Sequence, residues 1–264
     1  MPYANNNGVK IYYEVEGEGP PLVLAHGVTR ALDAWRAYGY AEALKNDFKL
    51  VLFDARGHGR SDKPHDTSAY TSKLRVGDVL TVLDEIGIGK AHYFGYSMGA
   101  RLGFRVATSA AARFHSFIFG GNSPYRSEAE NKANQDSLDT YKIMLADPEA
   151  AVRQRERAFG RPMTNEERAL YLANDAEALV ALGTAHLAWP PLTNDELSNI
   201  CVPCLLYCGD LDLRYAGAKE SASHIPQATF ISLPGLDHTP VFVRSDAVLP
   251  HVKKFLAEVS KNQA

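Results

Sequence analysis

Gly95-Tyr96-Ser97-Met98-Gly99 is the stretch that most constrains the fold of this chain. It follows a short aromatic and apolar run, residues 91–94, and precedes a segment with helical character, residues 100–112. A serine with glycine two positions away on each side, between a strand and a helix, is typical of a nucleophile elbow. Such a turn is tight, so we expect strained backbone at Ser97 and close packing around the two glycines.

Segments with strand and helix patterns alternate on both sides of the elbow. The turn sequence Asn5-Asn6-Asn7-Gly8 precedes an alternating strand. This βα alternation predicts an α/β fold, a mostly parallel central sheet flanked by helices. The expected strands are 9–15, 22–25, 49–53, 91–94, 117–121, 203–208 and 229–233, and the expected helices of the core are 31–45, 71–86, 100–112 and 245–260.

The alternation is interrupted in the middle of the chain. Between 124 and 196 no segment has a convincing strand pattern, whereas 149–158, 165–172 and 175–186 are charged and helical. Because the βα pattern then resumes, an insertion is a better explanation than an unrelated second domain. We therefore expect one core domain, formed by 1–123 and 197–264, with a helical cap inserted at 124–196.

Composition sets broad limits on function. The 264 residues are 45% hydrophobic and 22% charged, as in ordinary globular proteins, and the net charge of −3 gives no basic surface for nucleic acid. No apolar run is long enough to span a bilayer, and the first eight residues lack the apolar core of a signal peptide. We expect a cytoplasmic enzyme with a small-molecule substrate and without nucleic-acid or membrane partners. The oligomeric state stays open.

The three cysteines lie close together. Cys201 and Cys204 form a C-x-x-C pair, and Cys208 follows at the end of an expected strand. A redox or zinc site would need a helix N-terminus or a second pair of ligands, and neither accompanies this pair. We interpret all three cysteines as small buried hydrophobic residues, and we expect neither a metal nor another cofactor.

A serine nucleophile needs a base, and the base needs an acid to orient it. Among nine histidines, His238 stands out because it follows the last expected strand. Asp212 is the preferred acid, since it lies far enough into the loop after strand 203–208 to turn back toward His238. Asp210 is better suited to capping that turn. Asp237 is poorly placed to reach Nδ1 of the adjacent histidine.

Taken together, these features resemble the α/β-hydrolase superfamily over nearly the full length of the chain. The matching features are His26-Gly27, residues 54–62, the Ser97 elbow, Gly209-x-x-Asp212 and Gly235-x-x-His238. The chain is similar to the small, cap-bearing, cofactor-independent serine esterase and lactonase branch.

The resemblance also implies roles for residues outside the triad. Backbone amides of Val28 and Met98 would form the oxyanion hole. His26 would be a buried residue that shapes the oxyanion loop, and 56–61 would be a structural turn rather than a phosphate-binding loop.

A serine at the elbow favours acyl chemistry. We therefore expect hydrolysis of a small carboxylic ester or lactone by a Ser97-His238-Asp212 triad. Two alternatives stay open, a receptor-like protein of this fold that binds a ligand, and a hydrolase of a carbon–carbon bond in a diketone. The substrate pocket should lie between the carboxyl edge of the sheet and the cap. Its candidate lining residues, each equally suited to ordinary packing, are Trp35, Tyr96, Tyr125, Leu187 and Trp189.

Overall fold

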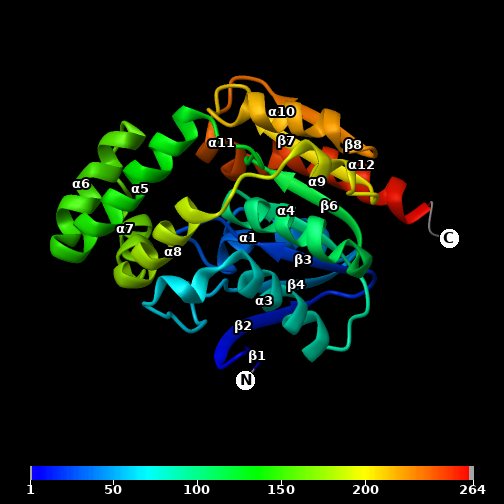
Figure 1. Cartoon of the computed structure of the whole chain (residues 1–264), viewed down its shortest axis with the longest axis horizontal. Coiled ribbons are helices and arrows are strands. Elements are labelled where there is room, and N and C mark those ends of the chain that lie inside the picture. The colour runs from blue at the N-terminus through cyan, green and yellow to red at the C-terminus, as the bar shows by residue number, and fades with distance from the viewer. Residues whose placement is uncertain (1, 262–264) are drawn as a thin grey trace.

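A central sheet of eight strands organises the computed structural model, which describes residues 2–261 (Figure 1). The strands are β1 (Tyr3–Asn6), β2 (Val9–Glu16), β3 (Pro21–Ala25), β4 (Lys49–Phe53), β5 (Ala91–Tyr96), β6 (Phe114–Gly120), β7 (Cys204–Gly209) and β8 (Ala228–Leu233). Their spatial order is β1-β2-β4-β3-β5-β6-β7-β8. Strands β3 to β8 run parallel to one another, whereas β1 and β2 form an antiparallel hairpin whose second strand pairs antiparallel with β4. The expected α/β sheet is confirmed.

Helices connect and cover the strands. Those of the core are α1 (Asp33–Ala37), α2 (Tyr40–Leu44), α3 (Ser72–Glu85), α4 (Met98–Ala110), α10 (Tyr215–His224), α11 (His238–Val243) and α12 (Ser245–Lys261), with short 3₁₀ helices η1 (Thr67–Tyr70) and η2 (Ala111–Arg113). Between β6 and β7 lie α5 (Glu128–Ala146), α6 (Pro148–Phe159), α7 (Asn165–Leu172), α8 (Ala176–Ala188) and α9 (Asn194–Ser198). Met1 and residues 262–264, which belong to the expected core domain, lie outside the described residues.

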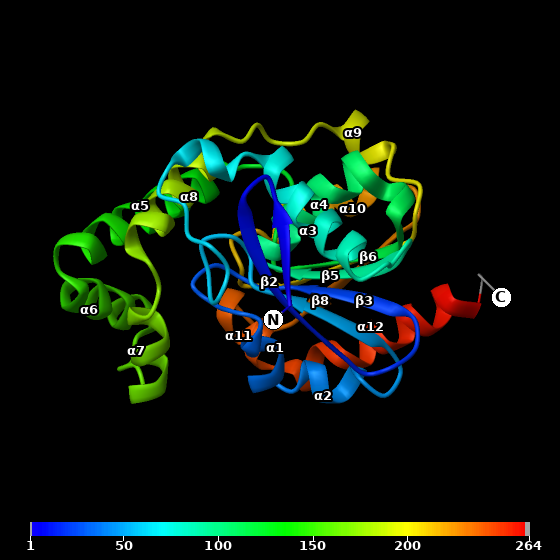
Figure 2. The ribbon, with the colours of Figure 1, turned by 90° about the horizontal axis from the view of Figure 1, so that it is seen from below.

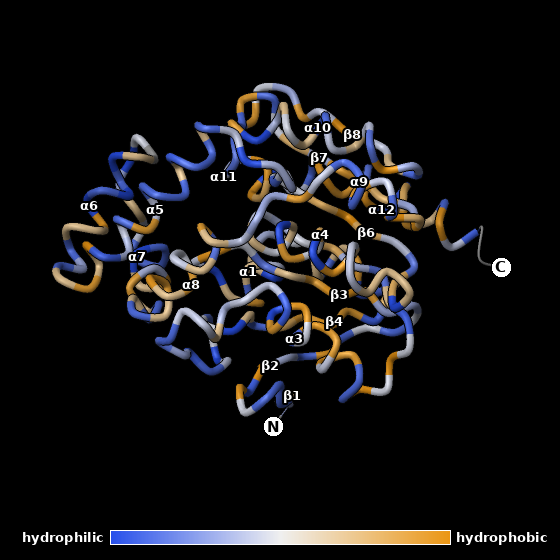
Figure 3. Tube along the Cα trace, viewed as in Figure 1, coloured by the Kyte–Doolittle hydropathy of each residue, from blue (hydrophilic) through white to orange (hydrophobic). Residues whose placement is uncertain are grey.

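The strands supply two hydrophobic cores, one on each face of the sheet. Leu22 and Leu24 of β3 pack with α1, α2 and α12, whereas Val23 and Ala25 pack with α3 and α4. This follows from the strand repeat, because successive side chains point to opposite faces. Figure 2 shows the two helical layers on opposite sides of the sheet, and Figure 3 shows apolar residues concentrated along the central strands.

Helices α5 to α8, which we call the helical insert, gather beyond the carboxyl edge of the sheet (Figure 1). Hydrogen bonds and ion pairs join the insert and its C-terminal flank to the core. Trp189 Nε1 donates a hydrogen bond to the Tyr70 carbonyl at 3.1 Å, and His65 Nε2 lies 3.0 Å from Asp175 Oδ2. Leu192 N donates to the Pro124 carbonyl at 3.1 Å, which joins the two ends of the segment 124–196 to each other. None of the helices in the described part of the chain is long and apolar enough to cross a membrane.

Two sequence-based expectations need correction. The single helix expected at 31–45 is two short helices, because Gly39 adopts φ 78° and breaks the helix between them. Glycine takes this left-handed conformation at little steric cost. Of the three cysteines, Cys204 and Cys208 are buried as expected, but Cys201 is exposed because it lies before β7 begins.

A buried ion pair fixes the loop after β4 beneath the helical insert. Arg56 Nε lies 2.6 Å from Asp78 Oδ2, and Arg56 Nη2 lies 2.5 Å from Asp78 Oδ1. The two side chains are 1% and 2% exposed, and Asn6 Nδ2 adds a further hydrogen bond to Asp78. The turn at 56–61 is therefore held by a charge pair within the protein.

Removing the charge of Asp78 should destabilise the fold strongly. Asp78→Asn leaves Arg56 buried without a counter-charge, and we expect the free energy of unfolding to fall by about 3–5 kcal/mol. Urea unfolding followed by circular dichroism measures this change. Asp84→Asn, on the same helix, removes only an exposed pair with Arg113 and should cost about 0–1 kcal/mol. Equal losses in the two variants would contradict the assigned role of the buried pair.

Candidate active site

Ser97 occupies a strained turn between β5 and α4. Its backbone angles are φ 53° and ψ −111°, a conformation that few residues other than glycine adopt. Packing explains the flanking glycines. A Cβ on Gly95 would lie 2.4 Å from the carbonyl carbon of Gly99, and one on Gly99 would lie 2.0 Å from the Ala25 carbonyl oxygen. Both contacts are impossible for a larger residue, so the expected elbow geometry is present.

Three side chains distant in sequence meet at this turn. His238 Nε2 lies 2.9 Å from Ser97 Oγ, and His238 Nδ1 lies 2.6 Å from Asp212 Oδ2. Asp212 comes from the loop after β7, and His238 is the first residue of α11. Because β5 and β7 run parallel, their carboxyl ends meet at the same edge of the sheet, and α11 follows the parallel strand β8. The structure thus brings together the serine, base and acid predicted from sequence.

The two neighbouring aspartates have other partners. Asp210 Oδ1 accepts a hydrogen bond from the Gly235 amide at 2.7 Å, which joins the loops after β7 and β8. Asp237 Oδ1 accepts one from the His238 amide at 2.6 Å and caps α11. Both carboxylates therefore fix loop geometry, while the imidazole contacts Asp212.

Asp212 is held in its ionised form. Burial alone would raise the pKa of this carboxyl, but the hydrogen bond and charge of His238, together with the charge and amide of Arg214, lower the pKa below its ordinary value. The Arg214 amide lies 3.0 Å from Asp212 Oδ1. A carboxylate at Nδ1 keeps the proton on that nitrogen, and the lone pair of Nε2 then faces Ser97 Oγ.

The two residues expected to form the oxyanion hole lie at the same cavity as the serine. Val28, Ser97 and Met98 line one cavity. Met98 is the first residue of α4, so its amide has no acceptor within the helix. A Cβ on Gly27 would lie 3.5 Å from Ser97 Cβ, which shows how closely the backbone before Val28 approaches the nucleophile.

His26 shapes the loop that carries Val28. It is 1% exposed, its Nε2 accepts a hydrogen bond from the Ala55 amide at 3.0 Å, and its Nδ1 lies 2.8 Å from the Gly27 carbonyl oxygen. An Nε2 that accepts and an Nδ1 that donates describe a neutral imidazole. Burial, the main cause, lowers the pKa of His26 and favours that neutral form.

The cavity at Ser97 has a volume of about 80 Å³ and lies between α4 and the helical insert. Eight of the twelve residues that line it are polar or charged. Besides Val28, Ser97 and Met98, the residues that line it are Arg101, Asn122, Asn134, Ser137, Tyr141, Leu182, Gly183, His186 and Arg214.

The aromatic residues expected in the pocket lie elsewhere. The expectation for Trp35 is wrong, because this side chain is fully buried in the core against Phe94 and Phe242. Tyr96 is buried below the elbow, where its hydroxyl donates to the His238 carbonyl.

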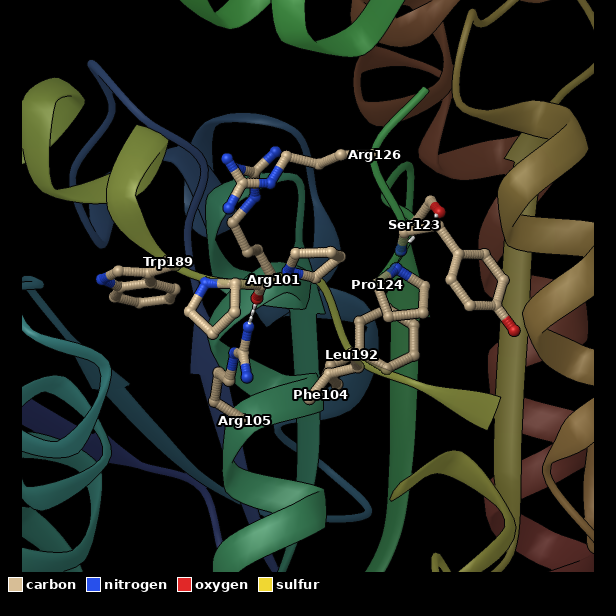
Figure 4. A pocket seen from close by; sticks show the side chains of 11 residues that line it. Arg101, Phe104, Arg105, Ser123, Pro124, Arg126, Trp189 and Leu192 are labelled. Atoms are coloured by element: carbon tan, nitrogen blue, oxygen red, sulfur yellow. Dashed lines mark hydrogen bonds between the residues drawn. The ribbon is translucent and has the colours of Figure 1, made fainter. Parts of the chain in front are cut away.

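The other three candidates lie at the two ends of the insert, Tyr125 before α5 and Leu187 and Trp189 at the end of α8. Tyr125 and Trp189 line a separate pocket beside α4 (Figure 4). Leu187 is half-buried, and its carbonyl accepts a hydrogen bond from Arg126. Packing of the insert on α4, which local sequence does not reveal, determines which residues reach Ser97.

Comparison with known proteins identifies the family. Residues 20–154 match the family model described as alpha/beta hydrolase fold. The chain belongs to the alpha/beta hydrolase fold family. The parallel sheet and the strand-turn-helix at Ser97 agree with this assignment.

Individual relatives of this alpha/beta hydrolase have diverse names. A provisionally named carbamate hydrolase of Azorhizobium caulinodans is 34% identical over 116 residues, 44% of this chain, and the match spans only 42% of that protein. A provisionally named 2-succinyl-6-hydroxy-2,4-cyclohexadiene-1-carboxylate synthase of Bacillus subtilis is 25% identical over 254 residues, 89% of this chain and 90% of the relative. The enol-lactonase of Burkholderia xenovorans has a solved structure with TM-score 0.79 and 28% identity, covering 97% of this chain and 100% of that one.

Proposed function

We propose that this alpha/beta hydrolase is a serine hydrolase that cleaves a small carboxylic ester or lactone through an acyl-enzyme. The observation that carries the proposal is the hydrogen-bonded series Ser97 Oγ, His238 and Asp212, with contacts of 2.9 Å and 2.6 Å. This arrangement activates a hydroxyl for attack on a carbonyl carbon.

The reaction follows from the positions of these groups. His238 Nε2 takes the proton of Ser97 as Oγ attacks the carbonyl carbon, and Asp212 stabilises the imidazolium that forms. The amides of Val28 and Met98 donate to the oxyanion of the tetrahedral intermediate. His238 then protonates the departing alcohol oxygen, which leaves in an ester or remains attached to the acyl chain in a lactone. Water, activated by the same imidazole, releases the acid.

We assign the segment 124–196 the role of a cap over Ser97. Its support is that Asn134, Ser137, Tyr141, Leu182 and His186 come from α5 and α8 and form one wall of the cavity. The opposite wall comes from the core. A substrate enclosed between them would be shielded from water, which strengthens the electrostatic interactions of the oxyanion hole.

The comparisons support the choice of ester or lactone. The enol-lactonase relative aligns over nearly all of both chains at an identity that goes beyond fold similarity alone. A serine at the elbow is suited to the acyl-enzyme that either substrate would form.

The lining of the cavity makes acyl length a sharp test. We expect kcat/KM for para-nitrophenyl acetate or butyrate to exceed that for the octanoate at least about tenfold, because most of the lining side chains are polar or charged and a long alkyl chain would cover them without hydrogen-bond partners. Initial rates of nitrophenol release measure this order.

Two results would count against the proposal. A rate that rises steadily to the octanoate would show that the described cavity does not limit the acyl group. No turnover of any ester or lactone, together with binding of a small ligand, would favour the receptor-like alternative.

A further inference from the structure

The cavity at Ser97 presents hydrogen-bond donors that lack acceptors. Among the described residues, the Arg101 guanidinium forms no hydrogen bond or ion pair, although its residue lines the cavity and is partly buried. Asn134 Nδ2, on the insert side of the cavity, and Arg214 Nε, on the core side, are buried and likewise have no acceptor. Buried polar atoms without partners are rare in folded proteins because they are costly. Here the atoms are all donors, which points to a ligand rich in acceptors.

The core side of the cavity also carries uncompensated positive charge. Burial, followed by the nearby charges of Arg214 and Arg126, lowers the pKa of Arg101 to about 10. Arg101 also lines the separate pocket beside α4, and Figure 4 shows the Arg101 and Arg126 side chains of that pocket extending in the same direction. Behind the cavity, Arg75 is 1% exposed and donates to His186 Nε2 at 2.5 Å. Burial and then the Arg75 charge lower the pKa of His186 well below its ordinary value, so this imidazole is neutral.

The carboxylates near Arg101 already have other hydrogen-bond or ion-pair partners. Asp212 contacts His238 and lies 3.3 Å from Arg214 Nη1, so it offsets part of the Arg214 charge. Glu130 is 3% exposed, and its carboxylate accepts from the Ser127 amide at 2.7 Å in a capping box at the start of α5. Arg101 is thus the cation in this wall that has no carboxylate against it among the described residues.

We propose that the substrate carries a carboxylate, bound by Arg101 with help from Arg214 and Asn134, in addition to the ester or lactone carbonyl that Ser97 attacks. The planar guanidinium fork matches a carboxylate through two parallel hydrogen bonds. This inference rests on the proposed function for the identity of the reaction.

The position of Arg101 sets the size of such a substrate. Arg101 lies one turn after Ser97 on α4, and its amide donates to the Ser97 carbonyl at 2.9 Å. Four residues of helix advance about 6 Å, so the two sites are a few bonds apart in the substrate. The half-ester of a short dicarboxylic acid, or a lactone with a short acidic side chain, has this spacing.

Two esters of matched shape test the inference. Monoethyl succinate carries a free carboxylate, and ethyl levulinate carries a neutral methyl ketone at the same place. We expect the wild-type enzyme to favour monoethyl succinate at least about tenfold in kcat/KM. Arg101→Gln should lower kcat/KM for monoethyl succinate about 100-fold, as for loss of one partner of a buried charge pair, and change that for ethyl levulinate less than about threefold.

Control variants separate recognition from folding and from net charge. Arg101→Lys keeps the charge without the planar fork and should retain part of the preference. Arg153→Gln removes the same charge from the exposed surface of α6 and should leave the ratio of the two esters unchanged. Circular dichroism and urea unfolding establish that each variant is folded. A wild-type preference near one, or equal losses on both esters in Arg101→Gln, would overturn the inference.

A binding experiment distinguishes failure of this inference from failure of the proposed function. Calorimetric titration of Ser97→Ala with succinate requires no turnover. We expect binding that the additional substitution Arg101→Gln weakens about 100-fold. Succinate binding without hydrolysis of either ester by the wild type would retain the carboxylate site and reject the esterase. Ester hydrolysis without preference and without succinate binding would retain the esterase and reject the site.

Discussion

Ser97→Ala is expected to lower kcat for ester hydrolysis at least about 10⁴-fold, with the fold unchanged. The elbow fixes Ser97 Oγ at 2.9 Å from His238 Nε2, and alanine has no atom there to attack a carbonyl. Only the oxyanion hole and substrate binding would then contribute to rate. Steady-state assays with para-nitrophenyl butyrate measure the loss, and circular dichroism measures the fold.

A matched serine and a double variant make this prediction specific. Ser109→Ala alters an exposed position on the same helix and should keep activity within about twofold, as for surface substitutions generally. His238→Ala combined with Ser97→Ala should be no slower than either single variant, because the two residues act as a unit. Activity of Ser97→Ala within about tenfold of the wild type would remove Ser97 from the reaction.

Asp212→Asn is expected to lower kcat by about 10⁴-fold, as in triads whose acid is replaced by its amide. The asparagine amide would donate to Nδ1, place the imidazole proton on Nε2, and leave no lone pair facing Ser97 Oγ. Loss of the carboxylate would also remove the charge that stabilises the imidazolium. The same ester assay measures this effect.

Asp210→Asn is the natural control, since it makes the same chemical change two residues earlier. Asp210 contacts the Gly235 amide rather than the imidazole, and the amide oxygen of asparagine can keep that contact. We expect activity within about threefold of the wild type, since a kept hydrogen bond costs little. If the Asp210 variant were inactive and the Asp212 variant active, the acid of the triad would not be Asp212.

Much of the core is predictable because its signals are local. The buried strand at 49–53 is found at the expected residues, since a short apolar run between polar segments has few other conformations in an α/β protein. The signal for the elbow is equally local. Gly95 and Gly99 have no side chain, and this permits the close backbone contacts around Ser97. Asp212 and His238 follow from their positions after strands whose carboxyl ends share an edge.

The cavity wall is less predictable because it depends on packing between distant segments. In sequence, Arg101 looks like a surface residue of an amphipathic helix, and only the insert over α4 turns it into part of a cavity. Its place one turn after the nucleophile is the signal that could have suggested it. The prediction for Trp35 failed in the opposite way, because a residue expected in the pocket lies in the core. A large aromatic ring suits either place.

The most direct test of the central claim is detection of an acyl group on Ser97. The protein is mixed with excess para-nitrophenyl acetate, quenched in acid within the first turnover, digested, and mapped by mass spectrometry. We expect one acetyl group on the peptide that contains Ser97, and a burst of nitrophenol that Ser97→Ala abolishes. Turnover with an unmodified Ser97 peptide at every quench time, or a burst that persists in Ser97→Ala, would contradict the account.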